Sequence, residues 1–166
     1  MKFILFGKSG VGKSTQEKLV SDILGIPKII STTTRKIRRD EIDGVDYHFV
    51  TKEAFFKLQA EESFVQISMF KGNHYGIQHS SISDNCVAVL EPIGIMQLQE
   101  IYDDIVPIKL ILPETLRQER LANRNTGQSM EDEERFDNFP AKYSIRADGT
   151  PEEVASQIVY ICRDCH

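Results

Sequence analysis

The sequence predicts an α/β fold in which a parallel β-sheet is covered by helices on both faces. Three short, mostly apolar runs at 3–6, 87–90 and 108–112 are typical of strands buried on both sides, and a helical segment follows each run. A glycine-rich turn joins the first run directly to the first helical segment. Because neither a repeat nor a linker-like tract divides the 166 residues, we expect one domain over residues 1–166.

The first strand and helix are the clearest pair of elements. Phe3 to Phe6 is a continuous apolar run, and the chain after the glycine-rich turn carries apolar residues at helical spacing. Gly25 and Pro27 then end this helix. Its buried face is expected to consist of Leu19, Val20, Ile23 and Leu24.

The later elements complete the alternation of strand and helix. Helices are expected from about residue 93 and from about residue 114, after the second and third apolar runs. The last helix has a capping-box signature, with Thr150 as N-cap, Pro151 in the first turn and Glu153 three residues after the threonine. These elements form the predicted core, which comprises residues of about 1–30, 80–122 and 143–166.

Two segments fall outside this alternation. The segment of about 31–79 is rich in β-forming residues, and it has turns at Asp43-Gly44 and Gly72-Asn73 and one helical piece near 52–62. This pattern predicts an inserted subdomain. The segment of about 123–142 is polar and charged, which predicts a mobile lid.

The composition argues against several classes of protein. A formal net charge of -5 weighs against general nucleic-acid binding, which requires a basic surface. The apolar start is too short for a secretory signal or a membrane span, so we expect no membrane association and a cytoplasmic location.

Three cysteines without an export signal indicate free thiols. Cys162 and Cys165 have the spacing of half a zinc site, but no second half accompanies them, and we interpret them, with His166, as part of the last helical turn.

The turn after the first strand matches the phosphate-loop pattern G-x-x-x-x-G-K-[ST] in full. Its glycines let backbone N–H groups surround phosphate oxygens, and the N-terminus of the following helix favours an anion. We expect Lys13 to direct its charge toward the outer phosphates and the Ser14 hydroxyl to bind Mg²⁺. The residues predicted to bind the nucleoside triphosphate are Gly7, Ser9, Gly10, Val11, Gly12, Lys13, Ser14 and Thr15.

This loop predicts a nucleoside triphosphate site but leaves the reaction open. A GTPase would carry an Asn-Lys-x-Asp motif on a later strand, and the sequence has none. A kinase needs a second set of phosphate ligands for its acceptor. Candidates lie in the stretch STTTRKIRRDEIDGVDYHF, where an acidic chain gathers four cations, Arg35, Lys36, Arg38 and Arg39; the alternative for such a run is a solvated loop.

The order of these motifs resembles the guanylate kinase family. The resemblance covers nearly the whole chain and includes GKSGVGKST, STTTRKIRRDEIDGVDYHFV, FKGNHYG, RLANR and YSIRAD. It implies an ATP- and Mg²⁺-dependent transfer of the γ-phosphoryl group to a nucleoside monophosphate, with GMP or dGMP as the acceptor. It also implies that Ser31 helps to read the base and that Lys36 and Arg39 have no functional role. The residues that it implies for the acceptor phosphate are Arg35, Arg38, Tyr47 and Tyr75.

The resemblance also implies a role for the arginines of the lid. In the family, residues matching Arg120, Arg124 and Arg135 close over the transferring phosphoryl group. Arg120 and Arg124 are four residues apart and share a helix face, and Arg135 lies in the next predicted helix. The alternative for each arginine is an ordinary charged helix surface. The catalytic residues expected on this basis are Lys13, Arg35, Arg120, Arg124 and Arg135.

The chain departs from the family pattern around the acceptor base. Gln66 stands where the family has a glutamate, Ile77 where it has a serine or threonine, and Glu91 where it has an aspartate. Guanine presents two donors at this edge, whereas Gln66 has one acceptor oxygen. Loss of such a contact at a buried site costs roughly 1–3 kcal/mol. Val89 and Ala147 also depart from the pattern, but Gln66, Ile77 and Glu91 are the ones that we expect to contact the base.

The sequence leaves three alternatives open. The departures at Gln66, Ile77 and Glu91 support one alternative, a kinase of the same fold with a different acceptor. This acceptor would be another ribo- or deoxyribonucleoside monophosphate or a ribosyl phosphate. A non-catalytic binding module usually has a damaged phosphate loop, and this loop is complete. Nucleic-acid binding through residues 35–39 is disfavoured by the acidic total charge. The expected partners are therefore nucleotides, and a monomer and a homodimer are both compatible with the sequence.

Overall fold

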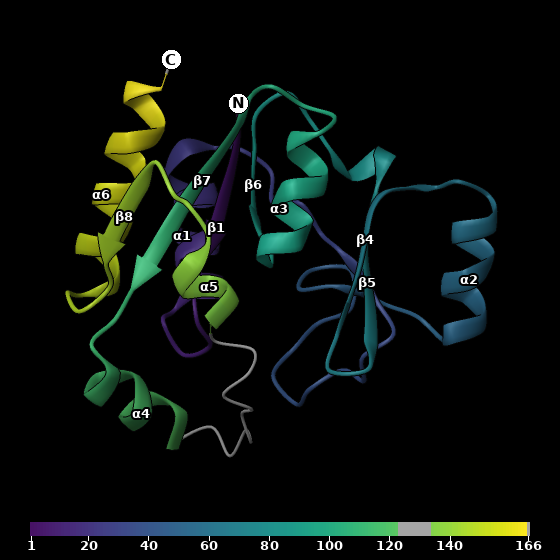
Figure 1. The fold of residues 1–166 in the computed structure, drawn as a ribbon, viewed down its shortest axis with the longest axis horizontal. Coiled ribbons are helices and arrows are strands. Elements are labelled where there is room, and N and C mark those ends of the chain that lie inside the picture. Colours follow the sequence, from purple (N-terminus) through teal and green to yellow (C-terminus); the bar gives the residue numbers. More distant parts are fainter. Residues whose placement is uncertain (123–133, 166) are drawn as a thin grey trace.

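The computed structural model describes residues 1–122 and 134–165 and shows the predicted α/β architecture (Figure 1). The strands are β1 (Lys2–Phe6), β2 (Thr32–Thr33), β3 (His48–Phe49), β4 (Phe64–Phe70), β5 (Asn73–Gln78), β6 (Cys86–Val89), β7 (Ile105–Ile111) and β8 (Tyr143–Arg146). The helices are α1 (Lys13–Leu24), α2 (Lys52–Ala60), α3 (Pro92–Gln99), α4 (Glu114–Ala122), α5 (Glu134–Asn138) and α6 (Pro151–Asp164), and a short 3₁₀ turn, η1, covers His79–Ser81.

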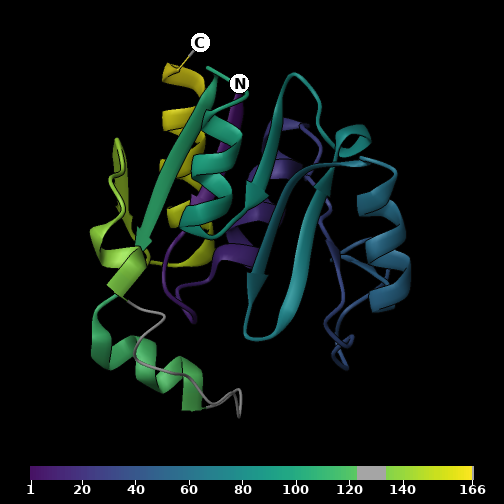
Figure 2. The same ribbon diagram turned by 45° about the vertical axis from the view of Figure 1, so that its right-hand side comes forward.

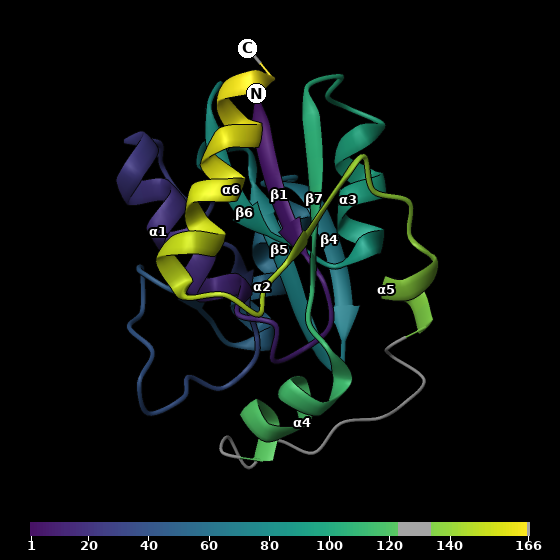
Figure 3. The same ribbon diagram turned by 90° about the vertical axis from the view of Figure 1, so that its left-hand side faces the viewer.

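The central sheet is parallel and has the strand order β6-β1-β7-β8. Figure 3 shows α1 and α6 on one side of this sheet and α3 on the other. The sequence did not predict β8, because this edge strand lacks an apolar run and buries only Ile145. The prediction of a parallel sheet covered on both faces is confirmed.

The core consists of two layers, one on each face of the central sheet. Successive side chains of β1 point to opposite faces, as strand geometry requires. Phe3 and Leu5 pack with Val20 and Ile158 from α1 and α6. On the other face, the layer with α3 contains Ile4, Phe6, Ile95, Leu98 and Phe136. Burial on both sides therefore explains why β1 is a continuous apolar run in the sequence.

One expectation for α1 is wrong. Ile23 is 49% exposed and does not belong to the buried face of the helix. The fully buried positions of α1 are Gln16 and Val20, four residues apart, and Leu24 packs partly buried on the same core. The helix is thus rotated so that the line from Gln16 through Leu24 faces the sheet.

Residues of the predicted insertion form a second sheet with the order β3-β2-β5-β4. β5 pairs antiparallel with both β2 and β4, and β4 and β5 form a hairpin. Helix α2 lies beside this sheet (Figure 2), where the Phe55 and Phe64 rings stack with their centroids 4.6 Å apart. Thr51 caps α2 by accepting a hydrogen bond from the Ala54 N–H at 3.2 Å. The expected helical piece of this segment is thereby confirmed.

The predicted capping box of the last helix is present. Thr150 Oγ1 accepts from the Glu153 N–H at 3.2 Å, and the Glu153 carboxylate accepts from the Thr150 N–H at 2.8 Å. Cys162 is buried near the end of α6, and burial raises the pKa of its thiol to about 12, with the charge of Cys165 as a smaller cause. The described residues contain no cluster of His, Cys, Asp and Glu that could hold a metal ion. His166 lies outside the described residues.

The predicted lid is described only in part. Residues 123–133 lie outside the described residues, and the rest of the predicted segment begins with α5. In the two described ranges, no helix has the length and apolarity needed to cross a lipid bilayer.

Candidate functional site

The phosphate loop connects the end of β1 to the first turn of α1. Gly12 is the N-cap of α1 with a φ of 95°, and no side chain caps the helix. The loop also needs Gly7, which has a φ of +149°, because a Cβ at this position would lie 2.5 Å from the Leu110 carbonyl oxygen. The first N–H groups of α1 are therefore open to an anion at the sheet edge.

Lys13 folds back over this loop. Its Nζ donates hydrogen bonds to the carbonyl oxygens of Gly7 at 2.7 Å and Lys8 at 3.0 Å. The same ammonium lies 5.8 Å from the centre of the Phe136 ring of α5. The charge of Lys13 is thus held directly above the backbone that would surround a phosphate chain.

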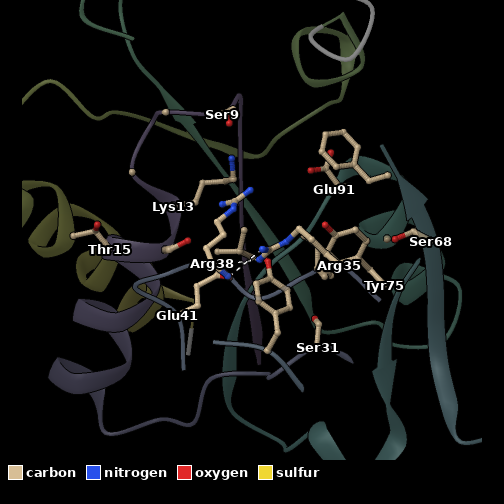
Figure 4. A pocket seen from close by; sticks show the side chains of 18 of the residues that line it. Ser9, Lys13, Thr15, Ser31, Arg35, Arg38, Glu41, Ser68, Tyr75 and Glu91 are labelled. Carbon is tan, nitrogen blue, oxygen red and sulfur yellow. Dashed lines mark hydrogen bonds and ion pairs between the residues drawn. The ribbon is translucent and has the colours of Figure 1, made fainter. Parts of the chain in front are cut away.

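A cavity of about 230 Å³ opens between the phosphate loop and the second sheet (Figure 4). It brings together residues that are up to 85 positions apart in the chain, from Ser9 to Gly94. Its lining includes most residues predicted for either nucleotide: Ser9, Gly10, Gly12, Lys13, Ser14, Thr15, Ser31, Arg35, Arg38, Tyr47, Gln66, Tyr75 and Glu91. The predicted donor and acceptor residues therefore face one shared space.

Four of these residues, Arg35, Arg38, Tyr47 and Tyr75, form a group that we call the Arg–Tyr cluster. The Arg35 guanidinium lies 5.3 Å from the centre of the Tyr47 ring, and the Tyr47 and Tyr75 ring centroids are 6.0 Å apart. The pKa of Tyr47 is raised to about 12, chiefly by burial and to a smaller extent by the nearby Tyr75 and Glu17, although Arg35 opposes the shift. The Tyr47 phenol is therefore a hydrogen-bond donor at neutral pH.

Glu41 orders the Arg–Tyr cluster, a role that sequence reasoning missed. Its carboxylate accepts from Arg35 Nη1 at 3.0 Å and Arg35 Nη2 at 2.7 Å, and from the Arg38 N–H at 2.9 Å. Burial alone would raise the pKa of Glu41, but the bonds from Arg35 and Arg38 outweigh it and the net pKa is lowered. Burial would likewise lower the pKa of Arg35, yet Glu41 raises it overall. Both side chains are thus charged and fixed as a two-bond pair.

Another part of the cavity wall is formed by β4, which pairs with β5 beside Tyr75, and by the first turn of α3. Gln66 is buried there, with only 4% of its surface exposed, and Ser31 is also buried. The structure does not bring Ile77 to the cavity, because its side chain is fully buried in the core layer that contains α3. Sequence reasoning missed Ser68, Phe70 and Gly94, which also line the cavity.

The three arginines expected over the phosphoryl group have different positions. Arg120 lines a second cavity, of about 310 Å³, behind the phosphate loop, and donates to the Ala147 carbonyl at 3.2 Å. Arg135 projects from α5 and lies 5.5 Å from the centre of the Phe70 ring. Arg124 lies outside the described residues. Arg120 and Arg135 therefore approach the loop and the main cavity from two sides.

The architecture and the order of the motifs agree with those of known proteins. The family pattern of guanylate kinase matches residues 1–144. The chain belongs to the guanylate kinase family. Guanylate kinases are similar to it in sequence: that of Schizosaccharomyces pombe is 51% identical over 85 residues, and that of Fusobacterium nucleatum is 34% identical over 135 residues. The matched parts cover 49% and 80% of this chain, and 41% and 73% of those relatives.

A solved structure shows the same relation. The crystal structure of guanylate kinase from Anaplasma phagocytophilum superposes with a TM-score of 0.78 at 25% sequence identity, covering 99% of this chain and 85% of that chain. Shikimate kinase from Aquifex aeolicus superposes with a TM-score of 0.52 at 16% identity, which is a likeness of fold alone.

Two further charged residues of this guanylate kinase family member escaped sequence reasoning. Arg117 of α4 is 1% exposed; it bonds the Glu114 carboxylate at 2.7 and 2.9 Å, and the Ser9 carbonyl of the phosphate loop at 3.3 Å. Glu17 of α1 has its pKa raised to about 7, chiefly by burial, although Lys28 and the backbone of Val89 oppose the shift. The three-residue spacing of Glu114 and Arg117 was a usable signal, but the full burial of Arg117 and the partial burial of Glu17 follow only from packing.

Proposed function

We propose that this chain transfers the γ-phosphoryl group of ATP to the phosphate of GMP or dGMP, which yields ADP and GDP or dGDP. Membership of the guanylate kinase family supports this reaction, since members are nucleoside monophosphate kinases. The observation that carries it is the shared cavity, in which a complete phosphate loop faces the Arg–Tyr cluster. The proposal places the reaction in the cytoplasm, with the chain as a monomer or homodimer.

The phosphate loop is proposed to hold the triphosphate of ATP. The uncapped N-terminus of α1 and the cradle of the loop backbone, whose positive φ values at Gly7 and Gly12 favour glycine, fit a phosphate chain. Lys13 already lies over this cradle, bonded to the carbonyls of Gly7 and Lys8. Ser14, in the first turn of α1 and on the cavity wall, would hold Mg²⁺ together with the phosphates. When bound, Mg²⁺ neutralises charge on the triphosphate.

The Arg–Tyr cluster is proposed to hold the acceptor phosphate. A phosphate dianion fits planar guanidinium groups and phenolic donors, and the raised pKa keeps Tyr47 in the donating form. Glu41 fixes Arg35 in advance, which lowers the conformational cost of binding. The attacking oxygen of a phosphate is already ionised, so the chain needs no general base and acts by alignment and charge stabilisation.

The arginines around the cavity are proposed to stabilise the charge that develops during transfer. Arg120 lies beside the loop, 3.8 Å from the position of a Cβ on Gly12. Arg135 lies over Phe70, a residue of the cavity wall. With Arg124, they would close over the phosphoryl group and exclude water, which otherwise hydrolyses ATP.

An acceptor screen tests this proposal. ADP release is measured with ATP, Mg²⁺ and, in turn, each ribo- and deoxyribonucleoside monophosphate and a ribosyl phosphate. We expect GMP and dGMP to be turned over with kcat/KM values in the range typical of metabolic enzymes, about 10⁴–10⁶ M⁻¹s⁻¹. A strong preference for a pyrimidine monophosphate or a ribosyl phosphate would replace GMP as the acceptor, and absence of all turnover with intact ATP binding would favour a non-catalytic module.

A further inference from the structure

Gln66 is a buried polar residue of the main cavity whose hydrogen bonding is incomplete. It lies in the middle of β4, is 4% exposed and lines the cavity. Within the described part of the chain, its Nε2 has no hydrogen-bond partner. A buried donor without a partner is unfavourable, and native sites usually leave one only where a ligand or water completes it. The carboxamide is therefore a candidate for contact with a substrate.

The packing around Gln66 keeps its carboxamide at the wall of the cavity. A Cβ at Gly94, in the first turn of α3, would lie 3.1 Å from Nε2 and 3.4 Å from Cδ, so only glycine leaves the group its full space. Ile77 is fully buried and, being apolar, adds no hydrogen-bonding group. Gln66 is thus held in a closely packed part of the cavity wall, with Nε2 beside Gly94 of α3.

The position of this edge follows from the proposed function, on which the inference rests. If the Arg–Tyr cluster holds the acceptor phosphate, the base extends away from the cluster toward β4 and α3. Gln66 of β4 and Glu91, the N-cap residue of α3, both line the cavity. The hydrogen-bonding pattern of Gln66 then bears directly on which bases fit.

A carboxamide offers one acceptor and one donor side by side, whereas a carboxylate offers two acceptors. A turned carboxamide also fits N1 and the 6-amino group of adenine, but in a kinase whose proposed acceptor is GMP the matching edge is the adjacent N1–H and C6=O of a 6-oxopurine. Guanine and hypoxanthine share this edge and differ only in the 2-amino group, which a carboxylate at position 66 would bind and a carboxamide does not. We propose that Gln66 reads the N1–H and C6=O groups, so that the acceptors of this chain include IMP and dIMP besides GMP and dGMP.

Comparison of GMP, IMP and AMP as acceptors for the unmodified chain tests this inference, and it does not depend on any variant folding. We expect kcat/KM for IMP to lie within about thirtyfold of that for GMP, and kcat/KM for AMP to lie more than tenfold below that for IMP. The inference is overturned if kcat/KM for IMP lies further below that for GMP, or if kcat/KM for AMP lies closer to that for IMP. In that case GMP turnover still supports the proposed function, whereas absence of turnover with all three overturns both.

A substitution separates the effect of Gln66 from that of the rest of the cavity. Gln66→Glu supplies a second acceptor for the 2-amino group and removes the donor to C6=O, so the ratio of kcat/KM for GMP to that for IMP should rise at least tenfold. Gln66→Met, similar in volume, should lower both values and leave the ratio unchanged. Gln59→Glu, the same change on the exposed side of α2, is the matched control. A ratio that Gln66→Glu leaves unchanged, in a variant with the circular dichroism of the parent, overturns the inference.

Discussion

The two sides of the main cavity are built in different ways. The phosphate-loop side is made by six residues within the short segment 9–15, and its chemistry comes mainly from backbone N–H groups and one lysine. The side that we propose for the acceptor is made by residues from the loop after β2, from β4 and β5 and from the N-terminal end of α3. The first side is therefore a local property of the chain, whereas the second exists only after a second sheet has folded beside the first.

Lys13→Ala is expected to have the largest effect on turnover, because the phosphate-loop side of the cavity concentrates its charge in one side chain. We expect kcat to fall by about 10³-fold, in the range seen when a preorganised donor is removed from an active site. Lys18→Ala, on the exposed face of the same helix, should leave kcat unchanged. Steady-state kinetics with thermal melting of both variants checks the prediction, and ordinary turnover by the Lys13 variant would contradict the proposed role of the loop.

Arg35→Met should have a smaller effect, because the acceptor side distributes its contacts over several side chains. We expect KM for GMP to rise by about 10²-fold, the loss of a two-bond ionic contact, while KM for ATP changes less than threefold. Arg39 is exposed, and the family resemblance implies no functional role for it, so Arg39→Met is the control. A rise in KM for ATP equal to that for GMP would mean that the two sides are not separate sites.

Glu17 belongs to α1, the helix that follows the phosphate loop, and it contributes to the raised pKa of Tyr47 in the Arg–Tyr cluster. Burial raises the pKa of Glu17 from 4.5 to about 7, so the folded state binds more protons than the unfolded state between these values. Its contribution is therefore full below about pH 4.5 and is lost as the pH rises through 7. Glu17→Gln should leave stability unchanged at pH 4.5 and increase the free energy of unfolding by roughly 1–3 kcal/mol at pH 8.

Urea unfolding of the Glu17→Gln variant at the two pH values measures this difference. Asp22→Asn, an exposed change on the same helix, serves as the control and should show no pH-dependent gain. An equal effect of Glu17→Gln at both pH values would contradict burial as the cause of the raised pKa.

Glu41→Gln is expected to have the smallest effect. The amide keeps one hydrogen bond to Arg35 but loses the charge that fixes the guanidinium, so KM for GMP should rise about three- to tenfold with kcat nearly unchanged. Asp40→Asn, at the neighbouring exposed position, should have no effect. A lowered KM for GMP would show instead that Glu41 competes with the acceptor phosphate for Arg35.

By itself, the sequence determined the elements whose signals are local. The apolar run of β1, the phosphate loop and the capping box at Thr150 appear in the structure where they were expected, because each depends on residues within a few positions of one another. The glycine spacing of the loop also predicted the donor side of the cavity, and motif order predicted the family.

Only the tertiary structure decided which side chains meet across the cavity and which are buried. Packing placed Ile77 in the core, left Ile23 exposed and brought Glu41 onto Arg35. It also buried Arg117 against the phosphate loop and paired the edge strand β8 with β7. Burial and long-range contact result from how two sheets and their helices pack, and no pattern within a few residues of the chain records them.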